Sequence, residues 1–315
     1  MPDASSRRER GEGKDPQPSF GHGRGSERSP LPRQDSRPQL PGSVADLPAL
    51  DPRFWSIIDA GLRELGETLA DDARAAIGAQ ARLLLAWNEH INLTALRLPE
   101  QVARGHVLDS LAALPLLRDL ARIRAGRSGQ ARPKVLDLGS GAGYPGLPIA
   151  VALPAGSCAL VESVRKKTAF LDVVADAAVA SLLGANRSRL ELRVLAERAE
   201  DLADEPDQRG AWDFVLTRAV GTLADVVELA MPLLAMGGHL VAWKADRDGS
   251  LDTELAAARP VAQATGGSRP RVERADPTGS LGFPNHRLVA VRKVRPTAHR
   301  FPRPPAERRR AAQLR

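Results

Sequence analysis

The chain has 315 residues, 43% of them hydrophobic, so it is long enough for one sizeable α/β domain with appendages and too short for two large domains with separate cores. Its single cysteine, Cys158, excludes an internal disulfide and a multi-cysteine zinc site, and no metal is expected. The net charge is +7, and no apolar run approaches the roughly 18 to 20 residues that cross a membrane, so we expect a cytoplasmic protein without a membrane partner.

The amino-terminal part of the chain divides into two segments of different composition. Residues 1–48 contain Pro, Gly, Ser and Arg with few aliphatic side chains. They are predicted to form a disordered extension, because too little apolar surface is available to offset the entropy of ordering. Residues 49–125 are predicted to form a helical lead-in, since apolar side chains recur there at three- and four-residue steps. One of its helices is expected from about residue 99 to 120.

The remainder of the chain alternates short β-rich runs with helical patterns, which is typical of a doubly wound sheet. The predicted strands are, in chain order, residues 134–139, 158–163, 190–195, 212–218, 237–244, 269–275 and 287–294. The last two are separated by a short turn instead of a helix, so they should pair antiparallel at the sheet edge. The fold class predicted for residues 126–296 is therefore α/β, with a mainly parallel sheet closed by an antiparallel hairpin.

Positive charge is concentrated at the carboxyl terminus. From Arg287 to the end there are ten basic residues and one acid, Glu307, so this segment carries +9 and the rest of the chain nets −2. Arginine at that density favours a polyanionic partner, most often nucleic acid. Residues 297–315 are accordingly predicted to be a basic tail; the alternative is a disordered tail that only aids solubility.

A glycine-rich loop links the first predicted strand to a helix, which is the arrangement of a nucleotide-binding site. Gly141, Gly143 and Gly146 satisfy the dinucleotide spacing, which by itself is weak evidence. Asp137, Gly139, Gly141 and Gly143 satisfy the S-adenosylmethionine form. We favour S-adenosylmethionine because Asp137 would repel a pyrophosphate and suits a cofactor that carries a sulfonium and an ammonium. A glycine turn that only connects two elements is the remaining alternative.

Further candidate residues stand where predicted strands end. Glu162 ends the second strand, at the place where an acid normally holds the ribose hydroxyls of a nucleoside cofactor. Ala199 and Glu200 follow the third strand and are expected beside the adenine. Arg218 ends the fourth strand, where such folds place the residues that face the reacting centre. Parallel strands end at one rim of the sheet, so we expect these side chains to share one site.

Five motifs occur in an order that resembles the RsmG (GidB) family. They are WNEHINLT (87–94), HVLDS (106–110), GSGAGYPGLP (139–148), LTRAV (216–220) and HRLVAVRKVRPT (286–297). The resemblance spans residues 52 to about 305 and includes a helical lead-in that generic methyltransferases lack. The long amino-terminal extension, Tyr144 and the arginine-rich end depart from the family pattern.

The resemblance implies a Rossmann-like methyltransferase fold and an activity. Members of the family transfer a methyl group from S-adenosylmethionine to nitrogen 7 of a guanine in 16S ribosomal RNA. Carried over by position, the resemblance implies cofactor contacts at Gly139, Tyr144, Ala199, Glu200 and Arg218. Arg218 is the candidate catalytic residue, and the expected partner is 16S rRNA, free or within the small ribosomal subunit. The protein is expected to be a monomer.

Asn92, His106, Asp109 and Lys244 are weaker candidates for positioning the substrate. His106 and Asp109 are three residues apart and Ser110 follows, so the three share one face of a helix and could face the site. An alternative of equal weight is a cluster that caps and packs the lead-in against the sheet.

Methyl transfer to nitrogen 7 needs no general base, because that atom already offers a lone pair. The sequence agrees, since it contains neither the Asn/Asp-Pro-Pro-Tyr motif used on exocyclic amines nor a cysteine after the fourth strand. The chain's work would then be alignment. Three other functions remain open: a small-molecule methyltransferase, a nicotinamide-dependent oxidoreductase and a non-catalytic RNA-binding protein.

Overall fold

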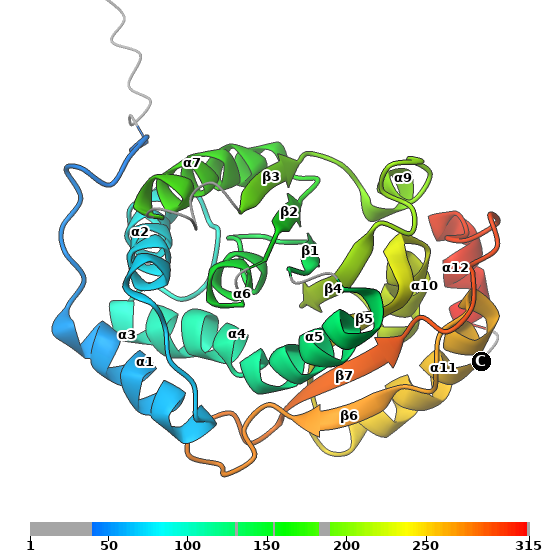
Figure 1. Cartoon of the computed structure of the whole chain (residues 1–315). Coiled ribbons are helices and arrows are strands. Elements are labelled where there is room, and N and C mark those ends of the chain that lie inside the picture. The colour runs from blue at the N-terminus through cyan, green and yellow to red at the C-terminus, as the bar shows by residue number, and fades with distance from the viewer. Residues whose placement is uncertain (1–39, 130–131, 154, 183–189, 314–315) are drawn as a thin grey trace, which may run out of the picture. The chain divides into compact units, whose positions relative to one another are not determined.

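The structure, a computed structural model, describes residues 40–129, 132–153, 155–182 and 190–313. Its centre is a seven-stranded sheet with the strand order β3-β2-β1-β4-β5-β7-β6 (Figure 1). The strands are β1 (Lys134–Leu138), β2 (Ser157–Val161), β3 (Glu191–Leu195), β4 (Trp212–Arg218), β5 (Leu234–Ala245), β6 (Arg271–Arg274) and β7 (His286–Arg292).

The sheet is parallel from β3 to β5, and β7 then pairs antiparallel with both β5 and β6. The predicted α/β class, the mainly parallel sheet and the closing antiparallel hairpin at its edge are therefore confirmed. The order of the strands reverses between β1 and β4. From β1 the chain adds β2 and β3 on one side, and from β4 it adds β5 on the other side. In open α/β sheets, ligands bind outside the carboxyl ends of the strands at such a switch point.

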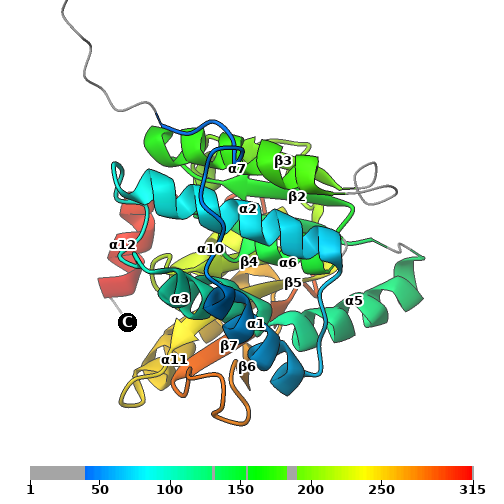
Figure 2. The same cartoon turned by 90° about the vertical axis from the view of Figure 1, so that its left-hand side faces the viewer.

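Helices cover both faces of the sheet (Figures 1 and 2). On one face lie α1 (Pro52–Leu65), α2 (Asp71–Asn88), α3 (Pro99–Val102), the π-helix η1 (Ala103–Leu108), α4 (Asp109–Leu111), α5 (Leu114–Ser128), α6 (Gly146–Ala152) and α7 (Arg165–Ser181). On the other lie α9 (Ala199–Leu202), α10 (Leu223–Leu233) and α11 (Ser250–Thr265), and α12 (Pro305–Gln313) ends the described chain. Successive strand residues alternate between two apolar cores: Val135 packs into the first and Leu136 into the second.

The lead-in differs from its predicted form at the helix expected over residues 99–120. That stretch is divided into α3, η1 and α4, a turn at Ala112 and Ala113, and then α5. Pro115 explains the break, because a proline inside a continuous helix would remove one hydrogen bond and clash with the carbonyl of Leu111. In the first turn of α5 it is acceptable, since amides there lack helical partners.

The folded part begins before the boundary expected at residue 48. Leu40 and Val44 already pack against the first core. The indole Nε1 of Trp87 donates to the carbonyl of Pro41 over 2.8 Å, and the guanidinium of Arg82 donates to the carbonyls of residues 44, 47 and 48. Composition concealed this segment, because its few apolar side chains are widely spaced. Residues 1–39 of the expected disordered extension lie outside the described residues.

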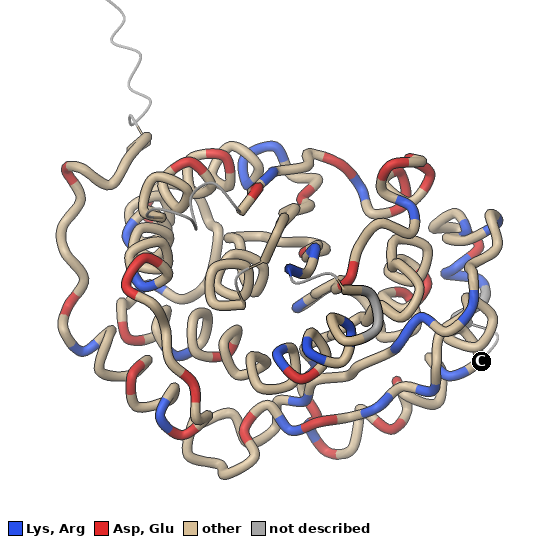
Figure 3. Tube along the Cα trace, in the orientation of Figure 1, with Lys and Arg blue, Asp and Glu red and all other residues tan. Residues whose placement is uncertain are grey.

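The C-terminal segment, expected as a basic tail, contacts the rest of the fold. Phe301 is buried, and Arg209 donates to the carbonyls of Thr297, Ala298 and Phe301. Arg303 forms three hydrogen bonds to the carboxylate of Glu228, two from its guanidinium and one from its backbone amide, and Glu228 is 2% exposed. Basic positions recur along β7 and through α12 (Figure 3). Some of these arginines therefore serve internal ion pairs instead of a partner.

Among the described residues, no helix combines the length and the apolar character needed to cross a membrane.

Candidate cofactor and acceptor site

The glycine-rich loop closes over the ends of β1 and β2. The amides of Gly139 and Ser140 both donate to the carbonyl of Val161, at 3.0 and 2.9 Å. Gly139, Gly141 and Gly143 have φ values of +71°, +60° and +83°, which explains why glycine stands at each. The loop thus presents bare backbone at the carboxyl ends of the central strands.

Asp137 holds this loop from beneath. Its Oδ2 accepts hydrogen bonds from the hydroxyl of Ser140 (2.6 Å) and the amide of Gly146 (2.9 Å). The side chain is fully buried, and burial raises its pKa to about 6 despite these two donors. A Cβ atom added at Gly146 would lie 2.6 Å from the Cβ of Asp137, so the helix must start with glycine there. Asp137 thus shapes the loop, and its expected contact with the cofactor remains a prediction.

A cavity of about 220 Å³ lies beside the loop, between the ends of β1, β2, β3 and β4. Four of the predicted cofactor residues line it: Gly139, Glu162, Ala199 and Glu200. Glu162 is 7% exposed, and its carboxylate accepts from the amides of Gly141 (3.1 Å) and Val164 (2.9 Å). Of the residues expected to share one site at the strand ends, Glu162, Ala199 and Glu200 line this cavity and Arg218 lines another.

Glu197 also lines this cavity, and sequence reasoning missed it. Among the described residues its Oε2 is buried without a hydrogen-bond partner. A buried unpartnered acceptor is costly, which indicates a ligand that donates there. The carboxylates of Glu162, Glu197 and Glu200 outnumber the one cation among the described lining residues, Arg198, so the cavity is unfavourable for a pyrophosphate and favourable for a nucleoside that carries positive charge. The residues present therefore fit S-adenosylmethionine better than a dinucleotide.

Arg218, at the end of β4, is held by the lead-in. Its Nη1 donates to Asp109 Oδ2 over 2.7 Å and to the carbonyl of Gly105 over 3.1 Å, and its Nη2 lies 2.9 Å from His106 Nδ1. The side chain of Arg218 is 16% exposed and that of Asp109 only 3%. The π-helix and α4 thus bring His106 and Asp109 to one guanidinium, so the predicted cluster joins the lead-in to the sheet and also touches the candidate catalytic residue.

His106 is a neutral acceptor in this arrangement. A guanidinium can only donate, so Nδ1 of His106 must accept and its Nε2 carries the proton, which it donates to Thr94 Oγ1 over 2.7 Å. Burial, and then the charge of Arg218, lower the pKa of His106 to about 4. The ring of Tyr144 stacks on His106 with centroids 4.8 Å apart. Tyr144 is buried and lines neither cavity of this site, so its predicted cofactor contact remains a prediction.

A second cavity, of about 340 Å³, lies next to Arg218. Asp109, Trp243, Lys244 and His286 also line it. His286 Nδ1 donates to Asp109 Oδ1 over 2.7 Å, and the indole of Trp243 donates to the carbonyl of Asp109 over 2.9 Å. Asp109 therefore connects the lead-in to β4, β5 and β7. Trp243 and His286 were not predicted; both lie in β-rich runs near strand termini, which is the signal that could have found them.

Lys244 and Asn92 differ in their placement. Lys244 lines the second cavity and donates to Glu254 Oε2 over 2.7 Å and to the carbonyl of Gly221 over 3.0 Å. Asn92 is exposed, and its Oδ1 accepts from Arg97 over 3.0 Å. It lines neither cavity, so the structure does not bring it together with the other candidates.

The lead-in also contacts the loop through Gln80 of α2. Its Nε2 donates to the carbonyl of Ala142 over 2.9 Å, and the side chain is fully buried. A Cβ atom added at Gly143 would lie 2.7 Å from the same nitrogen. Sequence periodicity placed residue 80 on a helix but could not show which element its polar group would meet.

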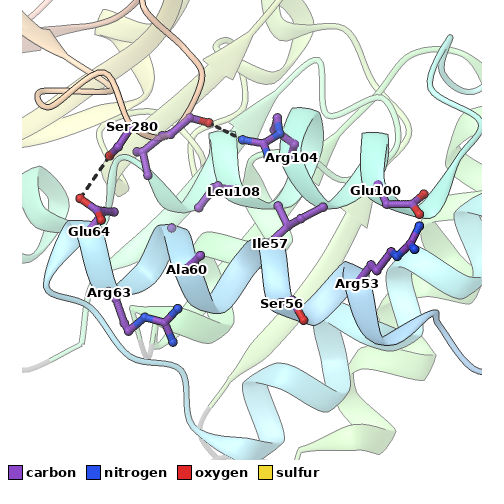
Figure 4. Close-up of a pocket in the computed structure, with 12 residues that line it drawn as sticks. Arg53, Ser56, Ile57, Ala60, Arg63, Glu64, Glu100, Arg104, Leu108 and Ser280 are labelled. Carbon is purple, nitrogen blue, oxygen red and sulfur yellow. Dashed lines mark hydrogen bonds between the residues drawn. The ribbon is translucent and has the colours of Figure 1, made fainter.

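A larger cavity, of about 500 Å³, lies away from the strand ends (Figure 4). It is formed by α1, the π-helix and the loop before β7, where Arg104 donates to the carbonyl of Leu281 and Ser280 donates to Glu64. None of the predicted site residues lines it, and we assign the cofactor to the cavity at the strand ends.

The sheet order, the glycine loop at the switch point and the acid-lined cavity define a Rossmann-like, S-adenosylmethionine-dependent methyltransferase. A model of the family rRNA small subunit methyltransferase G (GidB) matches residues 75–275, and the chain belongs to this family. The predicted family is thereby confirmed.

Individual relatives carry the same name, Ribosomal RNA small subunit methyltransferase G. The protein of Cupriavidus pinatubonensis is 40% identical over 187 residues, which cover 59% of this chain and 74% of the relative. That of Symbiobacterium thermophilum is 31% identical over 250 residues, 79% of this chain and 94% of the relative. That of Deinococcus radiodurans is 35% identical over 256 residues, which cover 81% of this chain and 91% of the relative.

Proposed function

We propose that this chain transfers the methyl group of S-adenosylmethionine to nitrogen 7 of a guanine in 16S ribosomal RNA. Membership of the small subunit methyltransferase family supports the reaction and the RNA substrate. The observation that carries the proposal is the position of Arg218, which the lead-in holds between the glycine loop and a cavity of about 340 Å³. Arg218 lies where a donor could meet the acceptor base beside the cofactor.

The smaller cavity takes the nucleoside part of the cofactor. Glu162 is placed to accept from ribose hydroxyls, and Gly139 and Ala199 leave room for the ligand because they have little or no side chain. The unpartnered oxygen of Glu197 suits an amino group such as that of adenine. When bound, S-adenosylmethionine supplies an electrophilic methyl group on a positively charged sulfur.

The second cavity takes the guanine. In a guanine the oxygen 6 and nitrogen 7 are both acceptors on one edge of the base. Nitrogen 7 must stay open toward the methyl group, so Arg218 is expected to donate to oxygen 6 or to a flanking phosphate. Lys244 is oriented in the same cavity by Glu254. The role of these cations is to fix the geometry of attack.

No residue needs to remove a proton. Nitrogen 7 would use its own lone pair for the bond to the methyl carbon as the methyl–sulfur bond breaks, so a neutral thioether would leave and the positive charge would pass to the purine. His106 agrees with this, since its Nδ1 accepts from Arg218 and its pKa is lowered to about 4. Asp109 is engaged by both Arg218 and His286. The rate enhancement would come from alignment in a preorganised site.

We further propose that the protein acts as a cytoplasmic monomer without a metal, and that exposed arginines of the C-terminal segment contact RNA phosphates. Arg309 and Arg310 are exposed on α12, next to the buried Arg308. Cations that meet phosphates release counterions, so RNA binding should weaken as salt rises.

The proposal is tested by methyl transfer to RNA. Small ribosomal subunits and naked 16S rRNA that lack the modification are incubated with the protein and methyl-labelled S-adenosylmethionine, and the RNA is digested to nucleosides. The expected product is labelled 7-methylguanosine. A label in another nucleoside would refute the assignment of nitrogen 7, and no label in either RNA would refute the RNA substrate.

Binding and transfer measurements distinguish the other possible functions. Binding of NAD with exclusion of S-adenosylmethionine would favour the oxidoreductase. Binding of RNA without cofactor binding would favour a non-catalytic RNA-binding protein. Methyl transfer to a small acceptor but to no RNA would favour the small-molecule methyltransferase.

A further inference from the structure

The C-terminal helix contacts a residue that lines the cavity we assign to the cofactor. Arg308 of α12 donates from Nη2 to Oε1 of Glu200, which lines that cavity. The two residues are separated by 108 positions in the sequence. The side chain of Arg308 is 8% exposed and that of Glu200 is 23% exposed. A buried guanidinium from the last helix therefore holds one carboxylate of the cavity wall.

Electrostatics give this contact a role in shaping the cavity. Glu162, Glu197 and Glu200 all line the same space, and three carboxylates there repel one another. Arg308 compensates Glu200 from a buried position, where solvent screens the interaction little. Without Arg308, Glu200 would be driven from the cavity toward solvent.

Polar atoms near this contact are left without partners among the described residues. In the part of the chain that the structure describes, Nε and Nη1 of Arg308 and Oε2 of Glu197 are buried without a hydrogen-bond partner. Buried donors and acceptors are nearly always paired in folded proteins. Glu197 lines the cavity together with Glu200, so its unpaired oxygen indicates that a ligand completes this wall.

The C-terminal segment has other anchors that do not involve Glu200. Arg209 binds the carbonyls of Thr297, Ala298 and Phe301, and Arg303 binds Glu228. Phe301 is buried as well. Loss of the Arg308 side chain should therefore remove the contact with Glu200 while the segment before α12 stays docked.

We propose that Arg308 is a positioning residue of the cofactor site, and that docking of α12 is thermodynamically coupled to binding of S-adenosylmethionine. This inference rests on the proposed location of the cofactor. Arg308 holds Glu200 in the orientation that the cofactor meets. By linkage, the docked helix raises cofactor affinity and bound cofactor stabilises the docked helix to the same extent. Glu200 lies within the family match and Arg308 lies beyond residue 275, where that match ends.

Cofactor affinity of the full chain tests the coupling. Isothermal titration with S-adenosylmethionine compares the unchanged protein with Arg308→Ala, and Arg309→Ala is the matched control because Arg309 is exposed on the same helix. We expect about a tenfold loss of affinity for Arg308→Ala and less than about a twofold change for Arg309→Ala. Arg308→Lys should recover part of the loss. In a double-mutant cycle, Glu200→Gln combined with Arg308→Ala should lose little more than either change alone.

Hydrogen exchange of the amides in residues 305–310 gives a second readout, which does not depend on activity. Added S-adenosylmethionine should slow exchange there in the unchanged protein and in Arg309→Ala, but not in Arg308→Ala. Equal affinity of a folded Arg308→Ala variant, or additive losses in the cycle, would overturn the coupling. The variant Glu162→Gln distinguishes this failure from failure of the proposed site. If Glu162→Gln lowers the affinity for S-adenosylmethionine and Arg308→Ala does not, only the coupling is rejected. If Glu162→Gln leaves the affinity unchanged, the assigned cavity is rejected.

Discussion

Arg218 has two proposed roles, one in the stability of the fold and one in methyl transfer. It neutralises Asp109, whose side chain is 3% exposed, and it lines the proposed acceptor cavity. We predict that Arg218→Ala lowers methyl transfer at least tenfold and the free energy of unfolding by about 3 to 5 kcal/mol, because a buried carboxylate loses its partner. Arg218→Lys should recover only part of the activity, since one ammonium cannot reproduce a planar fork. Single-turnover rates and urea denaturation provide the two measurements.

The double variant Asp109→Asn, Arg218→Ala separates the two roles. Removal of the buried charge should restore most of the stability, while methyl transfer stays low because the acceptor base has lost its donor. Recovery of activity together with stability would mean that Arg218 is only a structural residue.

Asp137 carries a prediction about pH. Its folded-state pKa, about 6, lies above the ordinary value of 3.8, so the folded protein holds this proton more tightly than the unfolded chain does. The stability that this group contributes is fully present below about pH 4 and is lost as pH rises through about 6. Asp137→Asn lacks this dependence. The difference in unfolding free energy between the two proteins should therefore change by about 3 kcal/mol across that window.

Urea denaturation at several pH values between 4 and 7 measures this difference. Other carboxylates titrate equally in both proteins, so they cancel. A difference that stays constant with pH would show that Asp137 ionises normally beneath the loop.

At the scale of the element, we predict that a substitution in the glycine loop prevents cofactor binding while the protein still folds. Gly141 has a φ of +60°, and a Cβ atom there would find its nearest neighbour at 4.0 Å. Gly141→Val should therefore fold with about 1 to 2 kcal/mol of backbone strain, while its side chain blocks the approach of the cofactor. Calorimetric titration with S-adenosylmethionine should show no binding.

Gly279→Val is the control, because Gly279 also has a positive φ, +79°, and open space, but lies in the loop before β7. It should lose similar stability and keep normal cofactor affinity. If Gly141→Val binds the cofactor as well as Gly279→Val does, the loop does not contact it.

At the scale of the whole molecule, the start of the folded region can be measured. A truncation that removes residues 1–45 deletes the packing of Leu40 and Val44 and the carbonyl of Pro41 that Trp87 meets. We expect it to lower the free energy of unfolding by about 2 to 4 kcal/mol. A truncation of residues 1–38 removes none of the described contacts and serves as the control. Equal melting temperatures for the two truncated proteins would place the boundary after residue 45.

The sequence by itself determined the fold class, the strands in chain order, the antiparallel hairpin and the glycine-rich loop. Each of these has a local cause. Strand and helix periodicities report which face of a segment is buried, and glycines such as Gly139 and Gly141 mark backbone that other residues adopt with strain. Glu162, Ala199 and Glu200 could be assigned to one site because parallel strands end at one rim of the sheet.

Only the tertiary structure decided which distant polar groups meet. Asp137 carries the expected charge next to the loop, yet packing turns it toward Ser140 and Gly146. The π-helix brings Asp109 to Arg218, and the docked α12 brings Arg308 to Glu200. Pairings of this kind depend on the angles at which whole elements pack. Composition and spacing along the chain indicate the secondary structure that each segment favours, but they do not indicate those packing angles.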